Sequence, residues 1–256
     1  MKRMISSILV SVSVLVLAVC FVTEAFAQKE LTVSAASSLT NAFGEIGKSF
    51  EIANPGAKVV LNFAASGVLL QQIDKGAPVD VFASADQKTM DQAVEKDLIV
   101  RDTRHNFASN ELVLILPQGS KTSVKTLGDL RAAEIKKIAL GNPESVPAGR
   151  YTQEVLTNEG LWEGLKPRLV FGENVRQVLD YVRRGEVDAG FVFATDAAVD
   201  KDRVTVGFEA RKHKPINYPI SVVASTKNKD LAKQFVQFVL STEAQGILSK
   251  YGFNKP

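Results

Sequence analysis

The chain has 256 residues, of which 45% are hydrophobic and 23% are charged. This balance is typical of a globular protein and excludes a chain that is disordered over most of its length. The 31 Lys and Arg residues are interspersed with 28 Asp and Glu residues, so the sequence has no basic surface of the kind that binds nucleic acid.

Residues 1–27 are predicted to be a cleaved signal peptide. Lys2 and Arg3 precede an apolar run over residues 8–22, and the small residues of "AFA" at 25–27 suit a signal peptidase. A membrane helix is the alternative interpretation, but the run is short and is interrupted by serines. We therefore expect an exported, periplasmic protein.

The single cysteine, Cys20, lies within this first segment. Val19 occupies the position where a lipoprotein box has a small residue, so a lipid anchor at Cys20 is the less favoured alternative. No cysteine remains after cleavage, which excludes disulfide bonds and a thiolate zinc site in the exported protein.

Short β-branched or aromatic runs alternate with helical patterns from residue 31 onward. Strands are predicted at residues 31–35, 58–63, 79–83, 111–116, 136–140, 168–171, 187–193 and 220–224. Apolar side chains at helical spacing predict helices that include residues 39–50, 90–94, 175–182 and 231–238, and a last helical piece to about residue 251. This alternation predicts an α/β fold with largely parallel sheets.

Two extended runs, "NELVLILPQGS" and "NYPISVVAST", are interpreted as strands that cross between two lobes. Lobe one would then hold residues 28–109 plus 220–256, and lobe two residues 110–219. One large doubly wound sheet is the alternative, because the same runs could be ordinary strands of a single sheet.

The sequence contains no catalytic motif of the G-x-S-x-G, phosphate-loop or H-E-x-x-H type. His105 and His213 lie in polar segments that we interpret as loops, and Asp86 is interpreted as a helix N-cap. Further carboxylates near predicted strand ends are interpreted as caps or turns: Asp80, Asp188 and Asp196. We expect no enzymatic activity and no cofactor, with an exported hydrolase as the alternative because catalytic triads assemble in space.

The chain also lacks the features of a bare metal-ion site. Exported two-lobed iron-binding proteins favour paired tyrosines, and the tyrosines here are scattered along the chain: Tyr151, Tyr181, Tyr218 and Tyr251. No metal site of this kind is therefore predicted.

One local pattern recurs at several predicted strand ends. A strand runs through small or polar residues into a helix start in "AASSLTNAF", "FAASGVLLQQI", "NPESVPAGRYTQEVL", "FGENVRQVLDYV" and "GFVFATDAAV". Helix N-termini carry unpaired N–H groups and a partial positive charge, so they attract anions without Lys or Arg. Such junctions are generic in α/β proteins, and the pattern alone leaves an anion site as one of two interpretations.

At these junctions the sequence resembles the ModA family, the periplasmic molybdate-binding proteins of ABC transporters. The matching segments run from about residue 31 to residue 253 and include "TVSAASSLTNAF", "NFAASGVL", "GAPVDVFASADQKTMD", "GNPESVPAG", "ENVRQVL", "VDAGFVFATDA" and "YPISVVAS". The resemblance implies a type II binding-protein fold of two lobes that enclose a tetrahedral dianion. It also implies a membrane ABC permease as partner, and we expect the protein to act as a monomer.

The resemblance assigns the ligand-binding residues. Ser38 and Ser66 would offer hydroxyl and backbone N–H donors from lobe one, while Ala148 and Val175 would offer backbone N–H groups from lobe two. The fifth family position departs from the pattern, because many members have a tyrosine where this chain has Phe193, which cannot donate. Either this protein binds with one donor fewer, or Ser37, Thr195 or a backbone N–H supplies the missing donor.

The expected ligand follows from the same donor set. Molybdate and tungstate are fully ionised near pH 7, so a site built only of donors suits them. Protonated forms of phosphate would also require an acceptor carboxylate, which none of these positions supplies. Sulfate, or another oxyanion, stays the alternative ligand, and the preference for molybdate over sulfate is implied by the resemblance alone.

Overall fold

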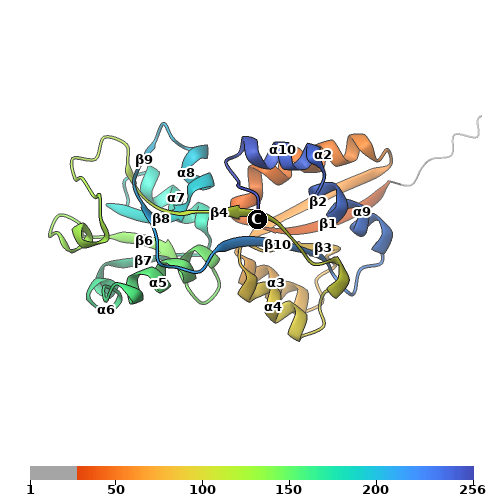
Figure 1. Ribbon diagram of the computed structural model, residues 1–256, viewed down its shortest axis with the longest axis horizontal. Coiled ribbons are helices and arrows are strands. Elements are labelled where there is room, and N and C mark those ends of the chain that lie inside the picture. Colours follow the sequence, from red (N-terminus) through yellow and green to blue (C-terminus); the bar gives the residue numbers. More distant parts are fainter. Residues whose placement is uncertain (1–27) are drawn as a thin grey trace, which may run out of the picture.

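Two five-stranded mixed sheets, each flanked by helices, make up the part of the chain that the computed structural model describes, residues 28–256 (Figure 1). The predicted signal peptide and Cys20 lie outside the described residues. No helix within residues 28–256 is long and apolar enough to span a membrane.

The first lobe is built on the sheet with strand order β2-β1-β3-β10-β4. Its strands are β1 (Lys29–Ala36), β2 (Ala57–Ala64), β3 (Val81–Ala83), β4 (His105–Asn110) and β10 (Ile216–Val222). Its helices are α2 (Thr40–Ala53), α3 (Ser66–Asp74), α4 (Gln87–Glu95), α9 (Lys229–Val239) and α10 (Thr242–Lys250), with short 3₁₀ helices η1 (Ser37–Leu39) and η2 (Arg101–Thr103). Strand β10 runs antiparallel to its neighbours β3 and β4.

The second lobe is built on the sheet with strand order β7-β6-β8-β5-β9. Its strands are β5 (Leu112–Pro117), β6 (Ile138–Gly141), β7 (Leu169–Gly172), β8 (Ala189–Phe193) and β9 (Val204–Ala210). Its helices are α5 (Pro147–Asn158), α6 (Trp162–Leu165), α7 (Val175–Arg183) and α8 (Ala194–Val199), with 3₁₀ helices η3 (Leu127–Arg131) and η4 (Lys166–Arg168). Strand β5 is the antiparallel member of this sheet.

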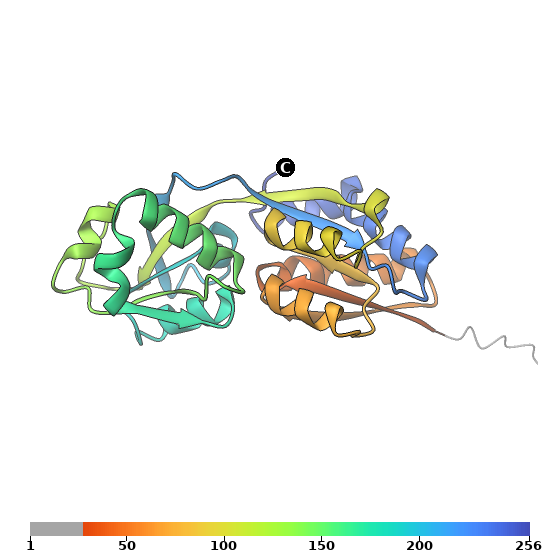
Figure 2. The ribbon, with the colours of Figure 1, turned by 90° about the horizontal axis from the view of Figure 1, so that it is seen from below.

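The chain crosses between the lobes twice, from β4 to β5 and from β9 back to β10. The two crossing segments lie side by side, since β4 pairs with β10 over Ile216↔Asn110 to Ile220↔His105 (Figure 2). Residues Ile216–Val222 thus hydrogen-bond within the first sheet, although the proposed lobe boundary lies at residue 220. Because only two adjacent strands connect the lobes, relative motion of the lobes has a natural hinge there.

Helix α2 shows how the apolar pattern becomes a core. Phe43, Ile46 and Phe50 are fully buried on the face that the sequence predicted, and the helix ends at Ala53, before Pro55. The ring of Phe50 packs edge-on against Phe235 of α9, with a centroid distance of 5.1 Å. Edge-to-face aromatic pairs of this kind stabilise beyond the area that they bury, so α9 is fixed against α2 on one side of the sheet.

All eight predicted strands are confirmed, but the prediction missed two, β4 and β9. His105, interpreted as a loop residue, is the first residue of β4, so that interpretation was wrong. The sequence of β4, "HNFASN", is largely polar, and it becomes a strand because β10 supplies its hydrogen-bond partners. His213 does lie in a loop, between β9 and β10.

Candidate functional site

A small closed cavity lies between the two lobes. The first lobe lines it at the ends of β1 and β2, in η1, at the start of α3 and after β3, and the second lobe at the starts of α5 and α7 and the end of β8. The twelve lining residues are Ala36, Ser37, Ser38, Ala64, Ala65, Ser66, Ala85, Val146, Pro147, Ala148, Val175 and Phe193. Its volume is about 10 Å³, about the space that one water molecule needs, so a tetrahedral oxyanion fits there only when the lining residues move slightly apart.

The five residues that the resemblance assigned to the ligand positions, and the candidate donor Ser37, all line this one cavity. Ser37, Ser38, Ser66 and the three residues of the second lobe, Ala148, Val175 and Phe193, come together although they are spread over more than 150 positions of the chain. Thr195, a candidate replacement donor, is not among the lining residues. No lining residue carries a charged side chain, so the polar groups that face the cavity are serine hydroxyls and backbone groups.

The backbone donors come from helix starts. Ala148 is the second residue of α5 and Val175 the first residue of α7, and N–H groups in a first turn have no carbonyl partner within their own helix. At α7 the cap side chain of Asn174 accepts from the N–H of Gln177, at 3.0 Å, and leaves that of Val175 uncapped. Converging helix starts give the cavity a positive potential without a cation.

Two glycines explain how the start of α5 reaches the cavity. A Cβ on Gly149 would stand 1.9 Å from the carbonyl oxygen of Gly141, and one on Gly141 would stand 2.3 Å from a methyl group of Val146. Real Cβ atoms do not approach this closely, so the end of β6 and the first turn of α5 pack together only because both residues are glycine. This close packing positions the N–H of Ala148.

The hydroxyl of Ser66 is set up to donate. Its Oγ accepts a hydrogen bond from the backbone N–H of Ala85, at 3.0 Å, and the residue is fully buried. A serine oxygen that already accepts still has its own proton to place. The cavity is where that proton can find an acceptor once an anion is present.

The hydroxyl of Ser38 contacts a residue that the sequence analysis did not assign to the site. Its Oγ lies 3.0 Å from the hydroxyl of Tyr218 on β10. Burial, reinforced by the charge of nearby Asp196, raises the pKa of Tyr218 well above its ordinary value, so the phenol stays protonated. The sequence offered "YPISVVAS" as a matching segment but no signal that its tyrosine reaches a serine 180 positions earlier.

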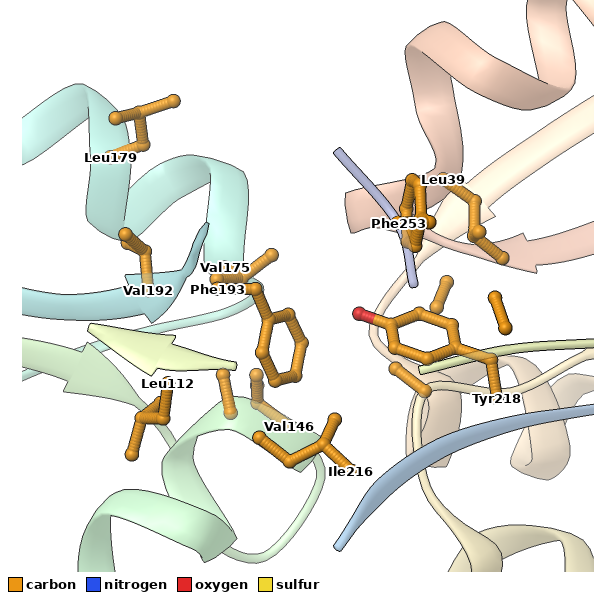
Figure 3. Packing of buried hydrophobic residues seen from close by; sticks show 14 of the residues in the cluster. Leu39, Leu112, Val146, Val175, Leu179, Val192, Phe193, Ile216, Tyr218 and Phe253 are labelled. Carbon is orange, nitrogen blue, oxygen red and sulfur yellow. The ribbon is translucent and has the colours of Figure 1, made fainter. Parts of the chain in front are cut away.

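Phe193 lies both at the cavity and in the aromatic core. Its ring lines the cavity and is also packed edge-on between Tyr218, at 5.8 Å, and Tyr151, at 6.4 Å. Figure 3 shows the ring of Phe193 facing Tyr218 across the boundary between the lobes, with Val146 and Val175 beside it. The hydroxyl of Tyr218 points towards this boundary.

Contacts made by Gly67, Arg150 and Arg176 help to hold the lobes together around the cavity. The backbone N–H of Gly67, in α3, donates to the carbonyl of Ser145 in the second lobe at 3.0 Å. Arg150, in α5, makes an ion pair with Asp86 of the first lobe at 2.6 Å. The structure is therefore the closed arrangement of the two lobes.

The third contact is made by Arg176 of α7. Its guanidinium donates to Asn41 Oδ1 at 2.8 Å and to the carbonyl of Ser38 at 3.3 Å in the first lobe, and to Asp196 Oδ1 at 2.5 Å in its own lobe. Burial raises the pKa of Asp196, and the adjacent Arg176 opposes that rise. Neither charged side chain lines the cavity.

The remaining carboxylates have structural roles. Asp86 is confirmed as the N-cap of α4, accepting from the N–H of Thr89 at 3.1 Å. Asp80 accepts from the N–H of Thr32 at 2.8 Å, and Asp188 from that of Lys136 at 2.7 Å, which ties adjacent segments together. Within residues 28–256, no group of three or more His, Cys, Asp or Glu side chains is placed to hold a metal ion.

A larger groove, of about 980 Å³, lies outside the cavity between α4 and α5. Charged side chains of both signs line it, among them Asp91, Glu95, Lys88 and Lys214. None of the predicted ligand-binding residues contributes to it. Its size does not make it the better candidate, because mixed charges open to water give no preference for an anion.

Sequence comparisons give the family context for this cavity. A family model described as bacterial extracellular solute-binding protein matches residues 31–254. A putative ABC transporter substrate-binding lipoprotein of Bacillus subtilis, YvgL, is 42% identical over 225 residues, which cover 87% of this chain and 85% of YvgL. The molybdate-binding protein ModA of Haemophilus influenzae is 38% identical over 232 residues, which cover 89% of this chain and 91% of that protein.

A solved structure extends the likeness to three dimensions. The periplasmic molybdate-binding protein of Azotobacter vinelandii is similar with a TM-score of 0.78 and 26% identity, over 88% of this chain and 99% of that one. The predicted two-lobed binding-protein fold is therefore confirmed.

Proposed function

The chain belongs to the family of its ModA relatives, within the bacterial extracellular solute-binding proteins, and we propose that it captures molybdate in the cavity between its lobes. One observation carries the proposal: a closed cavity lined by serines and helix starts, with no charged side chain. Molybdate has four acceptor oxygens and no proton near pH 7, so each oxygen can be met by a donor. The bound anion is proposed to touch Ser38, Ser66, Ala148 and Val175.

Neutral donors suit an anion that must be bound and released. A buried Lys or Arg would be costly to desolvate in the closed, empty state, whereas N–H and O–H groups carry no net charge. Hydrogen bonds to a charged group contribute roughly 1.5 to 3 kcal/mol each, so about five total on the order of 10 kcal/mol before the cost of association. That total supports binding at about micromolar concentration or tighter.

The ligand would stabilise closure, because its donors come from both lobes. An anion bound by Ser66 of the first lobe and Ala148 of the second loses half of its partners when the lobes separate. A ligand shifts a conformational equilibrium by its difference in affinity for the two states. We propose that the closed, loaded form is what an ABC permease recognises, and that the protein acts as an exported monomer.

Tungstate is proposed as a second ligand and sulfate as the competing assignment, since both are unprotonated tetrahedral dianions near pH 7. Calorimetric titration of the ligand-stripped protein, residues 28–256, with molybdate, tungstate, sulfate and phosphate tests the proposal. We expect binding of molybdate and tungstate and no binding of phosphate. Binding of sulfate alone would replace the proposed ligand, and hydrolysis of model esters would favour the alternative of an exported hydrolase.

Ser38 and Ser66, two of the three serines that line the cavity, should each be required for tight binding. Replacing Ser38 or Ser66 by Ala removes a hydrogen bond to a charged ligand, so we expect the Kd for molybdate to rise about 10- to 100-fold. The fold should survive, since Ala is small and fits at a helix start. Ser249→Ala, an exposed serine in α10, is the matched control. Unchanged affinity in both cavity variants would rule out the assigned site.

The family position at Phe193 gives a separate prediction. Phe193→Tyr adds the hydroxyl that many members carry, and we expect affinity for molybdate to be retained or increased, as measured by the same titration. The ring already lines the cavity, so an added hydroxyl should supply a hydrogen-bond donor that the wild-type protein lacks at this position. A large loss of affinity would instead mean that the ring fits too tightly between Tyr151 and Tyr218 for a hydroxyl.

A further inference from the structure

Behind Ser38 lies a buried chain of hydrogen bonds made by the two crossing strands. Asn110, the last residue of β4, donates from Nδ2 to the hydroxyl of Tyr218 on β10 at 3.2 Å, and this hydroxyl lies 3.0 Å from Ser38 Oγ. Nδ2 also donates to Thr195 Oγ1 at 2.8 Å. Tyr218 is fully buried and Ser38 is 2% exposed, so solvent does not compete for these bonds.

The direction of the chain is fixed at its far end. Asn110 Oδ1 accepts from the backbone N–H of Glu111 at 2.9 Å. A backbone N–H can only donate, so the amide oxygen must face it, and the amide nitrogen must face Tyr218. The Tyr218 oxygen is therefore an acceptor towards Asn110.

The remaining proton positions follow from this orientation. Tyr218 keeps its own proton, and among residues 28–256 the other polar atom within hydrogen-bond distance of its hydroxyl is Ser38 Oγ. Either hydroxyl could donate in this bond, but Tyr218 is fully buried away from the cavity whereas Ser38 lines it, so the direction that leaves no buried proton unpaired has Ser38 Oγ accepting from Tyr218. The proton of Ser38 then has no partner in the described protein, and the cavity that Ser38 lines is where an acceptor would lie.

We propose that Tyr218 is a positioning residue that holds the Ser38 hydroxyl as a donor aimed into the cavity, and so favours an anion that carries no proton. This inference rests on the proposed function, because it concerns how the same cavity selects its ligand. The Oγ of Ser66 likewise accepts a hydrogen bond from the protein, here from the N–H of Ala85, so that its own proton is free to donate. The hydroxyls of Ser38 and Ser66 thus each have an oxygen occupied by the protein and a proton left for the ligand.

This chain of hydrogen bonds from Asn110 through Tyr218 to Ser38, here called the relay, also connects ligand preference to the hinge. Asn110 and Tyr218 belong to β4 and β10, the strands that cross between the lobes, and Thr195 belongs to α8 of the second lobe. Separation of the lobes that pulls Thr195 away would remove one of the two acceptors of the Asn110 amide. We therefore expect the Asn110 amide, and with it the Tyr218 hydroxyl that contacts Ser38, to be held most firmly in the closed arrangement, where Nδ2 has both acceptors.

A double-mutant cycle tests the relay. Tyr218→Phe removes the hydroxyl and keeps the ring, which packs on Phe193, Phe107 and Phe253, so the fold should be kept. We expect calorimetry to give a Kd for molybdate raised about 5- to 15-fold in the wild-type background. In the Ser38→Ala background the same change should alter the Kd by less than about twofold, because residues that act through one another are not additive.

Two further variants separate the relay from a packing effect. Tyr151→Phe removes the hydroxyl of the other tyrosine that packs on Phe193 and should leave the Kd unchanged. Asn110→Asp replaces the donor towards Tyr218 by an acceptor, which draws the phenol proton away from Ser38 and should weaken binding. Adding Tyr218→Phe to Asn110→Asp should then restore part of the affinity, whereas a loss caused only by the added charge would persist.

The outcomes are distinguishable. Equal losses from Tyr218→Phe in the wild-type and Ser38→Ala backgrounds, or no recovery in the Asn110→Asp double variant, would overturn the relay while leaving the proposed function intact. A wild-type protein that binds neither molybdate nor sulfate in the same titration would overturn the proposed function and the relay with it.

Discussion

Replacing Gly67 by Ala is expected to weaken molybdate binding by about 100-fold or more while leaving the ligand-free protein at least as stable as the wild type. Gly67 is the second residue of α3, directly after Ser66, and lies at the contact between the lobes. Isothermal titration gives the first quantity and the thermal unfolding midpoint without ligand gives the second.

The geometry predicts opposite effects on the two states. In the closed arrangement a Cβ on Gly67 would stand 2.7 Å from the carbonyl oxygen of Ser145 and 2.9 Å from its Cα. Both atoms are backbone, so no side chain can rotate to make room, and the N–H···O bond between the same two residues would be lost. In the open arrangement the new methyl meets only water, and Ala in a helix is favoured over Gly by about 0.5 to 1 kcal/mol.

A matched control isolates the contact between the lobes. Gly44 lies inside α2 of the same lobe, and a Cβ built on it meets no atom within 4 Å. Gly44→Ala should therefore raise stability by a similar amount and leave the Kd unchanged. If Gly67→Ala bound molybdate as the wild type does, the closed arrangement described above would not be the one that holds the anion.

The strand-to-helix junctions of the site could be predicted from the sequence because each is encoded within a short segment, whereas the choice of residues at these junctions came from the resemblance to the ModA family. Ser38, Ser66, Ala148 and Val175 each follow a strand and open a helix, and all four line one cavity. A strand end, a small residue and a helical stripe are visible in about ten consecutive residues. The fold class was predictable for the same reason, since alternating strand and helix patterns specify an α/β arrangement.

Contacts between the lobes could not be predicted, because no local pattern encodes them. Gly67 meets Ser145, and Tyr218 meets Ser38 from 180 positions away, only after two separately folded sheets have been placed against each other. The missed strand β4 has a related cause. Its polar sequence carries no strand pattern, and its pairing with β10, which brings Asn110 to Tyr218, joins segments about a hundred residues apart.

Replacing Arg150 by Met is expected to weaken molybdate binding by about 100-fold through the same closure equilibrium. Arg150 Nε and Nη2 lie 2.8 and 2.6 Å from Asp86 Oδ2, and Nη2 also donates to Thr89 Oγ1 at 2.7 Å. The pair joins α5 of the second lobe to the first turn of α4 in the first. Met keeps most of the length of the side chain and none of its donors.

The size of the effect follows from burial. The side chains of Arg150 and Asp86 are 15% and 5% exposed, so in the closed state the variant leaves a carboxylate buried without its partner. Breaking a buried pair by removing one member costs about 3 to 5 kcal/mol. When the lobes separate, water reaches Asp86 and most of that cost disappears, so the variant favours the open state.

Two comparisons decide whether closure is the cause. Arg101→Met breaks the exposed pair of Arg101 with Asp97 within the first lobe, and should change neither affinity nor stability by more than about 1 kcal/mol. Asp86→Asn combined with Arg150→Met removes the unpaired charge and should recover part of the affinity lost in Arg150→Met alone. Small-angle scattering without ligand should give a larger radius of gyration for Arg150→Met than for the double variant. Equal radii together with an unchanged Kd would mean that the Asp86–Arg150 pair contributes nothing to closure, and that the anion and the contacts of Gly67 and Arg176 are sufficient to hold the lobes together.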